Sequence, residues 1–164
     1  MKLIIAALSK MTDLHKELKE LAKQKTEMIK KGDTPELQFL LKKENKAIQD
    51  IRKTEETLVQ NTTLFLEQKE MEIDSPILSK VIEVVEDTQE KSTILEQKEK
   101  LENEIKELKE LNQLNQDLLT QSLQFVQLSL ELLQPDIDSY NYDRSEKEHG
   151  NSKQTNHSMF DSKA

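Results

Sequence analysis

"KKGDTPEL", residues 30–37, carries the signals that end one helix and begin the next. Its two lysines suit the negative end of a helix macrodipole, and Gly32 can adopt the left-handed conformation that closes a helix. Asp33 or Thr34 can cap the following helix, with a proline suited to its first turn and a glutamate at the capping-box spacing. The stretch therefore predicts two antiparallel helices joined by a tight turn.

Apolar residues at helical spacing extend along the chain on both sides of this turn. Before the turn, the predicted buried face consists of Ala7, Met11, Leu14, Leu18, Leu21, Lys25 and Met28. After the turn, the predicted face consists of Leu37, Leu40, Leu41, Ile48, Ile51, Leu58 and Phe65. Glu44 and Glu55 interrupt this second face, and the second helix is predicted to end near residues 69–71.

The first ten residues, "MKLIIAALSK", are predicted to form the first turns of the first helix. Their apolar run stops at Leu8, whereas a signal peptide needs an apolar region of about 7–15 residues and a cleavage site with small residues. No run in the sequence approaches the roughly 18 apolar residues of a membrane span. We therefore expect a cytoplasmic protein without membrane insertion.

A second boundary lies at "EIDSPILSK", residues 72–80, where Ser75 offers a cap and Pro76 a first-turn position. The overlapping segment "PILSKVIEVVED", residues 76–87, is predicted to be a short apolar helix. "DTQE", residues 87–90, repeats the capping-box spacing, so a new helix can start there. The sequence alone equally allows one helix to continue through these four residues.

The last predicted helix changes character along its length. Its first section, "KEKLENEIKELKEL" at residues 98–111, is charged and carries one apolar seam. The next section, "NQLNQDLLTQSLQFVQLSLELL" at residues 112–133, contains only two charged residues, Asp117 and Glu131. Pro135 is predicted to end the helix, because proline disfavours helical conformation in the residue before it.

Two apolar stripes run along this nearly uncharged section. The first consists of Leu111, Leu114, Leu118, Phe125, Leu128 and Leu132, and the second of Leu119, Leu123, Val126, Leu130 and Leu133. A seam between two or three helices can cover one such face. The other stripe needs a further cover, since each buried leucine contributes roughly 1.5–3 kcal/mol relative to exposure. That cover can be the protein itself, a second copy or a different partner.

The composition limits the fold class. The chain of 164 residues has only two Gly and three Pro, so few turns are available and most residues must lie in long helices. We predict an all-α fold: an antiparallel helical bundle or coiled coil over residues 1–134. Residues 135–164 are polar and without period, and we predict that they form a disordered tail.

Charge and reactive side chains exclude several functions. A net charge of −8 with lysine and glutamate intermixed argues against binding to nucleic acid. The three histidines have no metal-ligand spacing, and the chain has no cysteine to complete a site. Carboxylates pair with lysines at i,i+4, as at Lys16/Glu20 and Glu102/Lys106. We therefore expect no enzymatic activity, no cofactor and no metal.

The sequence resembles the FlgN-type flagellar export chaperones. Residues 110–133, followed by "YNYDRSEKEHG" at residues 140–150, are similar to the C-terminal signature of that family. Residues 14–48 are similar to its first helix, turn and second helix, and residues 75–87 to its short middle helix. The resemblance covers about residues 10 to 142, and its C-terminal signature is the more specific part.

The resemblance implies a function and a set of partners. Members of this family are cytoplasmic chaperones that bind hook–filament junction proteins of the FlgK and FlgL type and deliver them to the flagellar type III export gate. The tail tyrosine of the family matches Tyr142, with Tyr140 as the competing position, and implies docking to the export gate. The positions that match the cargo-binding helix are Leu118, Leu119, Ser122, Leu123, Val126 and Leu130.

A structural protein is the alternative. In this reading the second stripe packs against the same stripe of another copy and forms a permanent coiled-coil homodimer.

Overall fold

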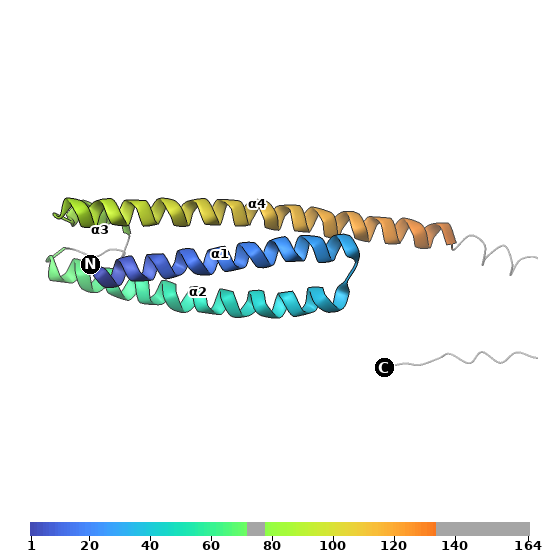
Figure 1. The fold of residues 1–164 in the computed structure, drawn as a ribbon, viewed down its shortest axis with the longest axis horizontal. Coiled ribbons are helices and arrows are strands. Elements are labelled where there is room, and N and C mark those ends of the chain that lie inside the picture. Colours follow the sequence, from blue (N-terminus) through green and yellow to red (C-terminus); the bar gives the residue numbers. More distant parts are fainter. Residues whose placement is uncertain (72–77, 134–164) are drawn as a thin grey trace, which may run out of the picture. The chain divides into compact units, whose positions relative to one another are not determined.

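The computed structural model describes residues 1–71 and 78–133, and these residues form helices without any strand (Figure 1). The helices are α1 (Lys2–Lys31), α2 (Thr34–Gln68), α3 (Leu78–Val84) and α4 (Thr88–Leu133). The predicted all-α class of long helices is therefore confirmed. The predicted tail and the predicted cap at Ser75 and Pro76 lie outside the described residues.

The chain divides into two units, Met1–Gln121 and Ser122–Ala164. The first unit holds α1, α2, α3 and most of α4. The described part of the second unit is the C-terminal end of α4, residues 122–133. The proposed division at residues 134 and 135 stays a prediction.

The turn between α1 and α2 forms as the sequence predicts. Gly32 adopts a left-handed conformation with φ of 69°, and its N–H donates to Ile29 O at 3.1 Å. Asp33 is the N-cap of α2, and its carboxylate accepts a 3.1 Å hydrogen bond from Glu36 N. In a full capping box the Glu36 side chain would accept a hydrogen bond from the Asp33 N–H. Here the Asp33 N–H donates to Met28 O instead, so only one of the two hydrogen bonds forms. This turn makes α1 and α2 an antiparallel hairpin.

Small side chains form the seam between α1 and α2. The buried residues of α2 recur every seven positions at Leu40, Ala47 and Thr54. The Thr54 hydroxyl donates to Asp50 O at 2.8 Å, so its burial leaves no unpaired donor. Because interaxial distance depends on the side chains at the contact, Ala and Thr let the two helices approach closely.

The predicted seam of α2 is partly wrong. Leu40 is buried as expected, but Leu41 and Ile48 are exposed on a neighbouring face of the helix. Helical spacing identifies residues that share a face, and it does not say which face meets the next helix. The remaining predicted seam residues are only half-buried: Leu37, Ile51, Leu58 and Phe65.

Helix α1 buries two faces because it contacts both α2 and α4. The predicted residues Ala7, Met11, Leu18 and Leu21 are buried, while Leu14 and Met28 are half-buried. The second face was missed in the sequence because it includes small and polar residues. It comprises Ile4, Leu8, Thr12, Ala22, Thr26 and Ile29.

Asn115 joins α4 to α1 inside the bundle. Its side-chain Nδ2 donates to Ala22 O at 2.9 Å, and its Oδ1 accepts from Thr26 Oγ1 at 2.6 Å. Nearer the N-terminal ends of the same two helices, Lys19 of α1 forms ion pairs with Glu104 and Glu107 of α4. Both sets of contacts match increasing residue numbers on α1 with increasing numbers on α4, so these two helices run parallel.

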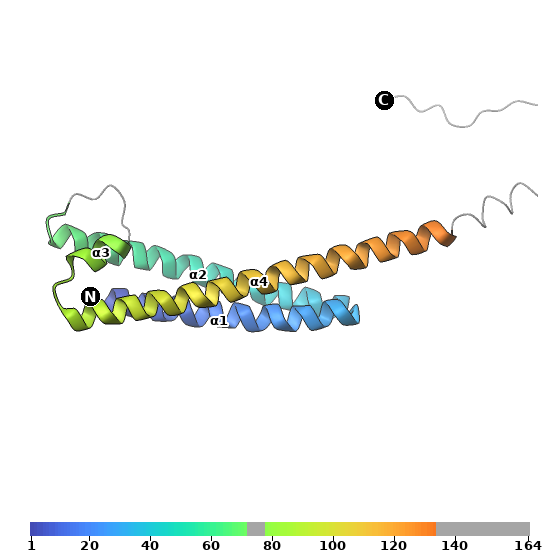
Figure 2. The ribbon, with the colours of Figure 1, turned by 90° about the horizontal axis from the view of Figure 1, so that it is seen from above.

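Helix α3 closes one end of the first unit (Figures 1 and 2). Its Val81 is buried beside Leu66 of α2 and Ile94 of α4, in a cluster to which α1 also contributes Ile4 and Leu8. The chain leaves α3 at Val84 and begins α4 at Thr88.

Asp87 starts α4, which resolves the alternative that the sequence left open. Its carboxylate Oδ1 accepts from Gln89 N at 2.8 Å and from Glu90 N at 3.0 Å. Residues 85–87 are not helical, so α3 and α4 are separate helices.

Several ion pairs differ from those expected. Lys16 pairs with Asp13 at 3.7 Å in place of the expected Glu20, and Glu102 pairs at 3.0 Å with Lys98, also at i,i+4, in place of the expected Lys106. The carboxylates of Glu104 and then Glu107 raise the pKa of Lys19 by accepting hydrogen bonds from it. The same hydrogen bond from Lys19 lowers the pKa of Glu107.

Two of the three charged residues in the predicted apolar faces form one ion pair. Lys25 Nζ of α1 lies 2.6 Å from Glu44 Oε1 of α2, and both side chains are mostly buried. The pairing explains how the seam tolerates both charges. Glu55, the other predicted interruption, is exposed beside the buried Thr54.

Substitution of Lys25 tests this pair. Lys25→Met leaves the Glu44 carboxylate without its cation, and we expect the free energy of unfolding to fall by about 2 kcal/mol. The double variant Lys25→Met/Glu44→Leu should recover stability to within about 1 kcal/mol of the wild type, because two apolar side chains replace the pair. Urea unfolding followed by circular dichroism measures both values.

Lys30→Met is the matched control. Its 3.1 Å pair with Glu27 is exposed, so its loss should change stability by less than about 1 kcal/mol. A double variant as unstable as Lys25→Met would show that the pair does not account for the loss.

Candidate protein-binding surface

The C-terminal end of α4 presents large apolar side chains to solvent. Within residues 122–133, Leu123 is 70% exposed, Phe125 73%, Val126 54% and Leu130 57%. Leu128, Leu132 and Leu133 are also exposed. We call residues 122–133 the apolar end of α4. An exposed apolar patch of this kind marks a surface that binds another molecule.

Both predicted stripes are exposed in the apolar end. Phe125, Leu128 and Leu132 belong to the first stripe, and Leu123, Val126 and Leu130 belong to the second. The expectation that an internal seam covers one stripe is therefore wrong for residues 122–133 in the single chain. Earlier in α4 the seam runs through Leu101, Ile105 and Leu108, as predicted for the charged section, and continues to Asn115, at steps of four, three and seven residues.

The residues matched to a cargo-binding helix lie in two settings. Leu123, Val126 and Leu130 are strongly exposed, and Ser122 beside them is exposed too. Leu118 and Leu119 belong to the first unit, where Leu118 is half-buried and Leu119 faces a groove described below. Tyr140 and Tyr142 lie outside the described residues.

Polar side chains in the apolar end add almost no charge. Ser129 Oγ donates to Phe125 O at 2.8 Å, so this hydroxyl is satisfied by its own helix. Glu131 is the one carboxylate in residues 122–133, and its Oε1 accepts a hydrogen bond from Gln127 Nε2 at 3.4 Å. A partner can cover such a surface without stripping water from several charges, which would be costly.

Residues 1–71 and 78–133 hold no metal-binding cluster and no membrane-spanning helix. Among them, no group of three or more His, Cys, Asp and Glu side chains is placed to hold a metal ion. His15 is half-buried, with Nδ1 2.7 Å from Met11 O. None of the helices in residues 1–71 and 78–133 has the length and apolar character needed to cross a membrane.

A helical bundle with a nearly uncharged, exposed apolar helix end is typical of proteins that bind other polypeptides. Comparison with known families narrows this class. The model of the family described as FlgN protein matches residues 1–150, so the chain belongs to the FlgN family. Membership indicates a flagellar export chaperone, which binds flagellar export substrates.

A relative in Bacillus subtilis (strain 168) is similar over almost the full length. It is described as "Uncharacterized protein YvyG" and is 34% identical over 163 residues, which cover 99% of this chain and 98% of the relative. No solved structure matches this chain.

Substitutions in the apolar end test whether it is surface or core. Leu123→Ser/Val126→Ser removes two exposed side chains, and we expect the free energy of unfolding to change by less than about 1 kcal/mol. Ile94→Ala, at a fully buried position, should lower it by roughly 2–5 kcal/mol. Thermal and urea unfolding of the full chain would report both. A loss for the double variant as large as that for Ile94→Ala would place the stripe in a core.

Proposed function

We propose that this protein is a cytoplasmic chaperone for hook–filament junction proteins of the FlgK and FlgL type. It holds their amphipathic terminal segments on the apolar end of α4 until the flagellar type III export gate receives them. The cargo contacts in this proposal are made by Leu118, Leu119, Ser122, Leu123, Val126 and Leu130.

The exposure of the apolar end carries this proposal. An amphipathic helix of the cargo has one apolar face, and the exposed stripe at Leu123, Val126 and Leu130 offers a second apolar face that can pack against it. Burial of each such side chain contributes roughly 1.5–3 kcal/mol, so three of them can supply the core of an interface. The lack of charge between them lowers the desolvation cost of binding.

Delivery needs a second contact that does not compete with the cargo. In this proposal Tyr142, or else Tyr140, docks to the export gate. Both residues follow Pro135, which separates them in sequence from the cargo-binding helix.

The same exposed leucines also support the structural alternative, a permanent homodimer. The two proposals differ in how the protein behaves without cargo. A chaperone with a free surface keeps the same size over a wide range of concentration and binds an apolar dye, whereas a dimer hides the stripe and dissociates only on dilution. Analytical ultracentrifugation and dye fluorescence on the same sample distinguish them.

Titration with cargo tests the proposed contacts. We expect Leu123→Ser/Val126→Ser to weaken binding of a junction-protein terminal segment by at least about 2 kcal/mol, near thirtyfold, because buried apolar anchors dominate interfaces. Gln124→Ser, at an exposed polar position between them, should leave affinity within about threefold. Isothermal titration calorimetry provides the comparison, and equal affinities for wild type and double variant would contradict the proposal.

Substitution of the tail tyrosine separates delivery from cargo binding. Tyr142→Ala should leave folding and cargo affinity unchanged while it impairs export of the junction proteins in a flagellated cell. Tyr140→Ala is the control that decides between the two candidate positions. A parallel loss of cargo affinity in Tyr142→Ala would show that the tail belongs to the cargo site.

A further inference from the structure

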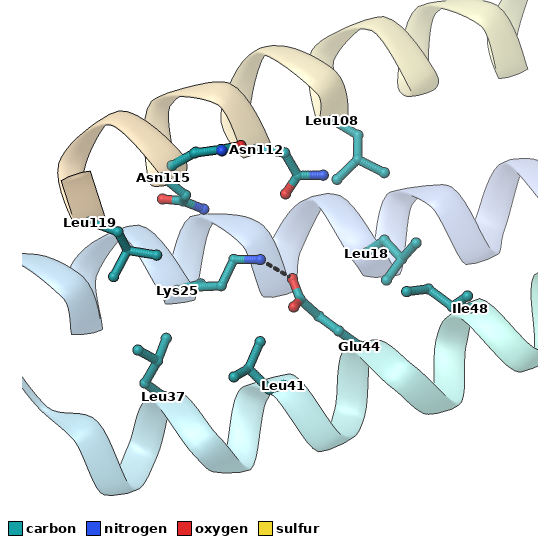
Figure 3. A pocket seen from close by; sticks show the side chains of 11 residues that line it. Leu18, Lys25, Leu37, Leu41, Glu44, Ile48, Leu108, Asn112, Asn115 and Leu119 are labelled. Atoms are coloured by element: carbon teal, nitrogen blue, oxygen red, sulfur yellow. Dashed lines mark hydrogen bonds and ion pairs between the residues drawn. The ribbon is translucent and has the colours of Figure 1, made fainter.

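A groove in the first unit lies between α2 and α4, with α1 as its floor (Figure 3). Its volume is about 520 Å³, within the range of ligand-binding sites. Leu37 and Leu41 point into it from α2, and Leu119 points into it from α4. All of its lining residues lie between Leu18 and Leu119, so the groove belongs to the first unit alone.

The groove lies on the same faces of α2 and α4 that α3 covers at the other end of this unit. On α2, Leu41, Ile48, Thr62 and Leu66 lie 7, 14 and 4 residues apart, so they share one face of the helix. Leu66, which shares a core cluster with Val81 of α3, is 0% exposed, whereas Leu41 is 43% exposed and Ile48 39%. The two ends of one stripe thus differ in whether a fourth helix lies on them.

The covered end shows what kind of occupant this stripe accepts. Helix α3 has seven residues and packs with Val81, while Val85 beside it is also buried. An isolated helix of this length is not stable in water, so α3 depends on burial of its aliphatic face against α2 and α4. A short amphipathic helix is therefore a proven occupant of the space between these two helices.

The uncovered part of the stripe on α2 sets the length of the helix that the groove can bind. Leu37 and Ile48 are eleven residues apart, which is about 16 Å along α2, or about three helical turns. A segment of this length from another protein can bury aliphatic side chains against Leu41 and Ile48 on one side and Leu119 on the other.

The polar residues that line the groove indicate which type of side chain suits the middle of a bound helix. The Lys25–Glu44 pair at 2.6 Å lies in the floor, and its two charges cancel. Asn112 and Gln116 add uncharged amides from α4. A charged residue in the occupant would find no unpaired opposite charge here, whereas a hydroxyl or amide side chain would find donors and acceptors.

We propose that this groove is a second substrate-binding site, which takes a three-turn amphipathic helix of the export substrate in the place that α3 fills at the other end. The occupant carries aliphatic residues at both ends of its buried face and an uncharged polar residue in the middle. This inference rests on the proposed chaperone function, and it adds a site in the first unit that shares Leu119 with the proposed cargo contacts but does not include Leu123, Val126 or Leu130.

Site-specific fluorescence tests the groove directly. The chain has no cysteine, so Leu41→Cys in the full-length protein gives one labelling position for an environment-sensitive dye such as bimane. We expect a blue shift of its emission when a purified hook–filament junction protein is added, with saturation at the Kd found by calorimetry. Lys46→Cys is the matched control, because Lys46 is exposed two positions from Glu44 and so faces away from the groove.

Substitution gives the second measurement. Leu41→Gln/Ile48→Gln, at two partly exposed positions, should weaken binding of the junction protein at least about tenfold, while Lys46→Gln leaves it unchanged. Circular dichroism and thermal unfolding confirm that both variants keep the fold. The dye measurement does not depend on these variants, so it decides the matter even if the double substitution unfolds the protein.

The outcomes separate the two proposals. If the junction protein binds but neither the dye at residue 41 nor the double variant responds, the groove inference is wrong and the chaperone function stands. If the wild type does not bind the junction protein, both are wrong. A blue shift that appears on raising the concentration of the labelled protein alone would identify a second copy as the occupant and would also overturn the inference.

Discussion

The hydrogen bonds of Asn115 fix the position of α4 on the hairpin. Its amide donates to Ala22 O and accepts from Thr26 Oγ1, and all of these groups are buried. A slip of α4 by one turn would leave a buried amide without partners, which costs about 1–3 kcal/mol. A single buried polar residue can set helix register in this way. With this register, Lys19 meets Glu104 and Glu107, and Leu119 faces the groove.

The nearly uncharged section of α4 lies in two different surroundings. Up to Asn115 its seam residues pack on the hairpin, and amides such as Asn112 and Gln116 line a groove without adding charge. Beyond Gln121 the same composition, rich in Leu, Gln and Ser, presents an exposed apolar surface. Low charge therefore serves internal register in one part of the helix and suits recognition of a partner in the other.

The sequence predicts the helix ends better than it predicts the seams. Boundaries are local: Gly32 and Asp33 decide the first turn, and Asp87 decides the start of α4. A seam depends on which helix faces pack together. The spacing of a leucine such as Leu41 is the same whether it packs against another helix or lines a groove. Ala47, Thr54 and Thr26 were missed because their importance lies in small size and in hydrogen bonds within the bundle. The stripe at Leu123, Val126 and Leu130 was expected to need a cover beyond the seam, and it is exposed, whereas the exposure of Phe125, Leu128 and Leu132 was not expected.

The short length of α3 links the fold to its proposed substrates. Seven residues cover Leu66 and Ile94 at one end of the stripe and leave Leu41 and Ile48 uncovered at the other. A longer α3 would complete a four-helix bundle and remove the groove. A short amphipathic segment without stable structure of its own gains helix on binding. A bundle that stops short of its fourth helix can supply the missing packing partner for such a segment, with the same aliphatic contacts that already hold α3.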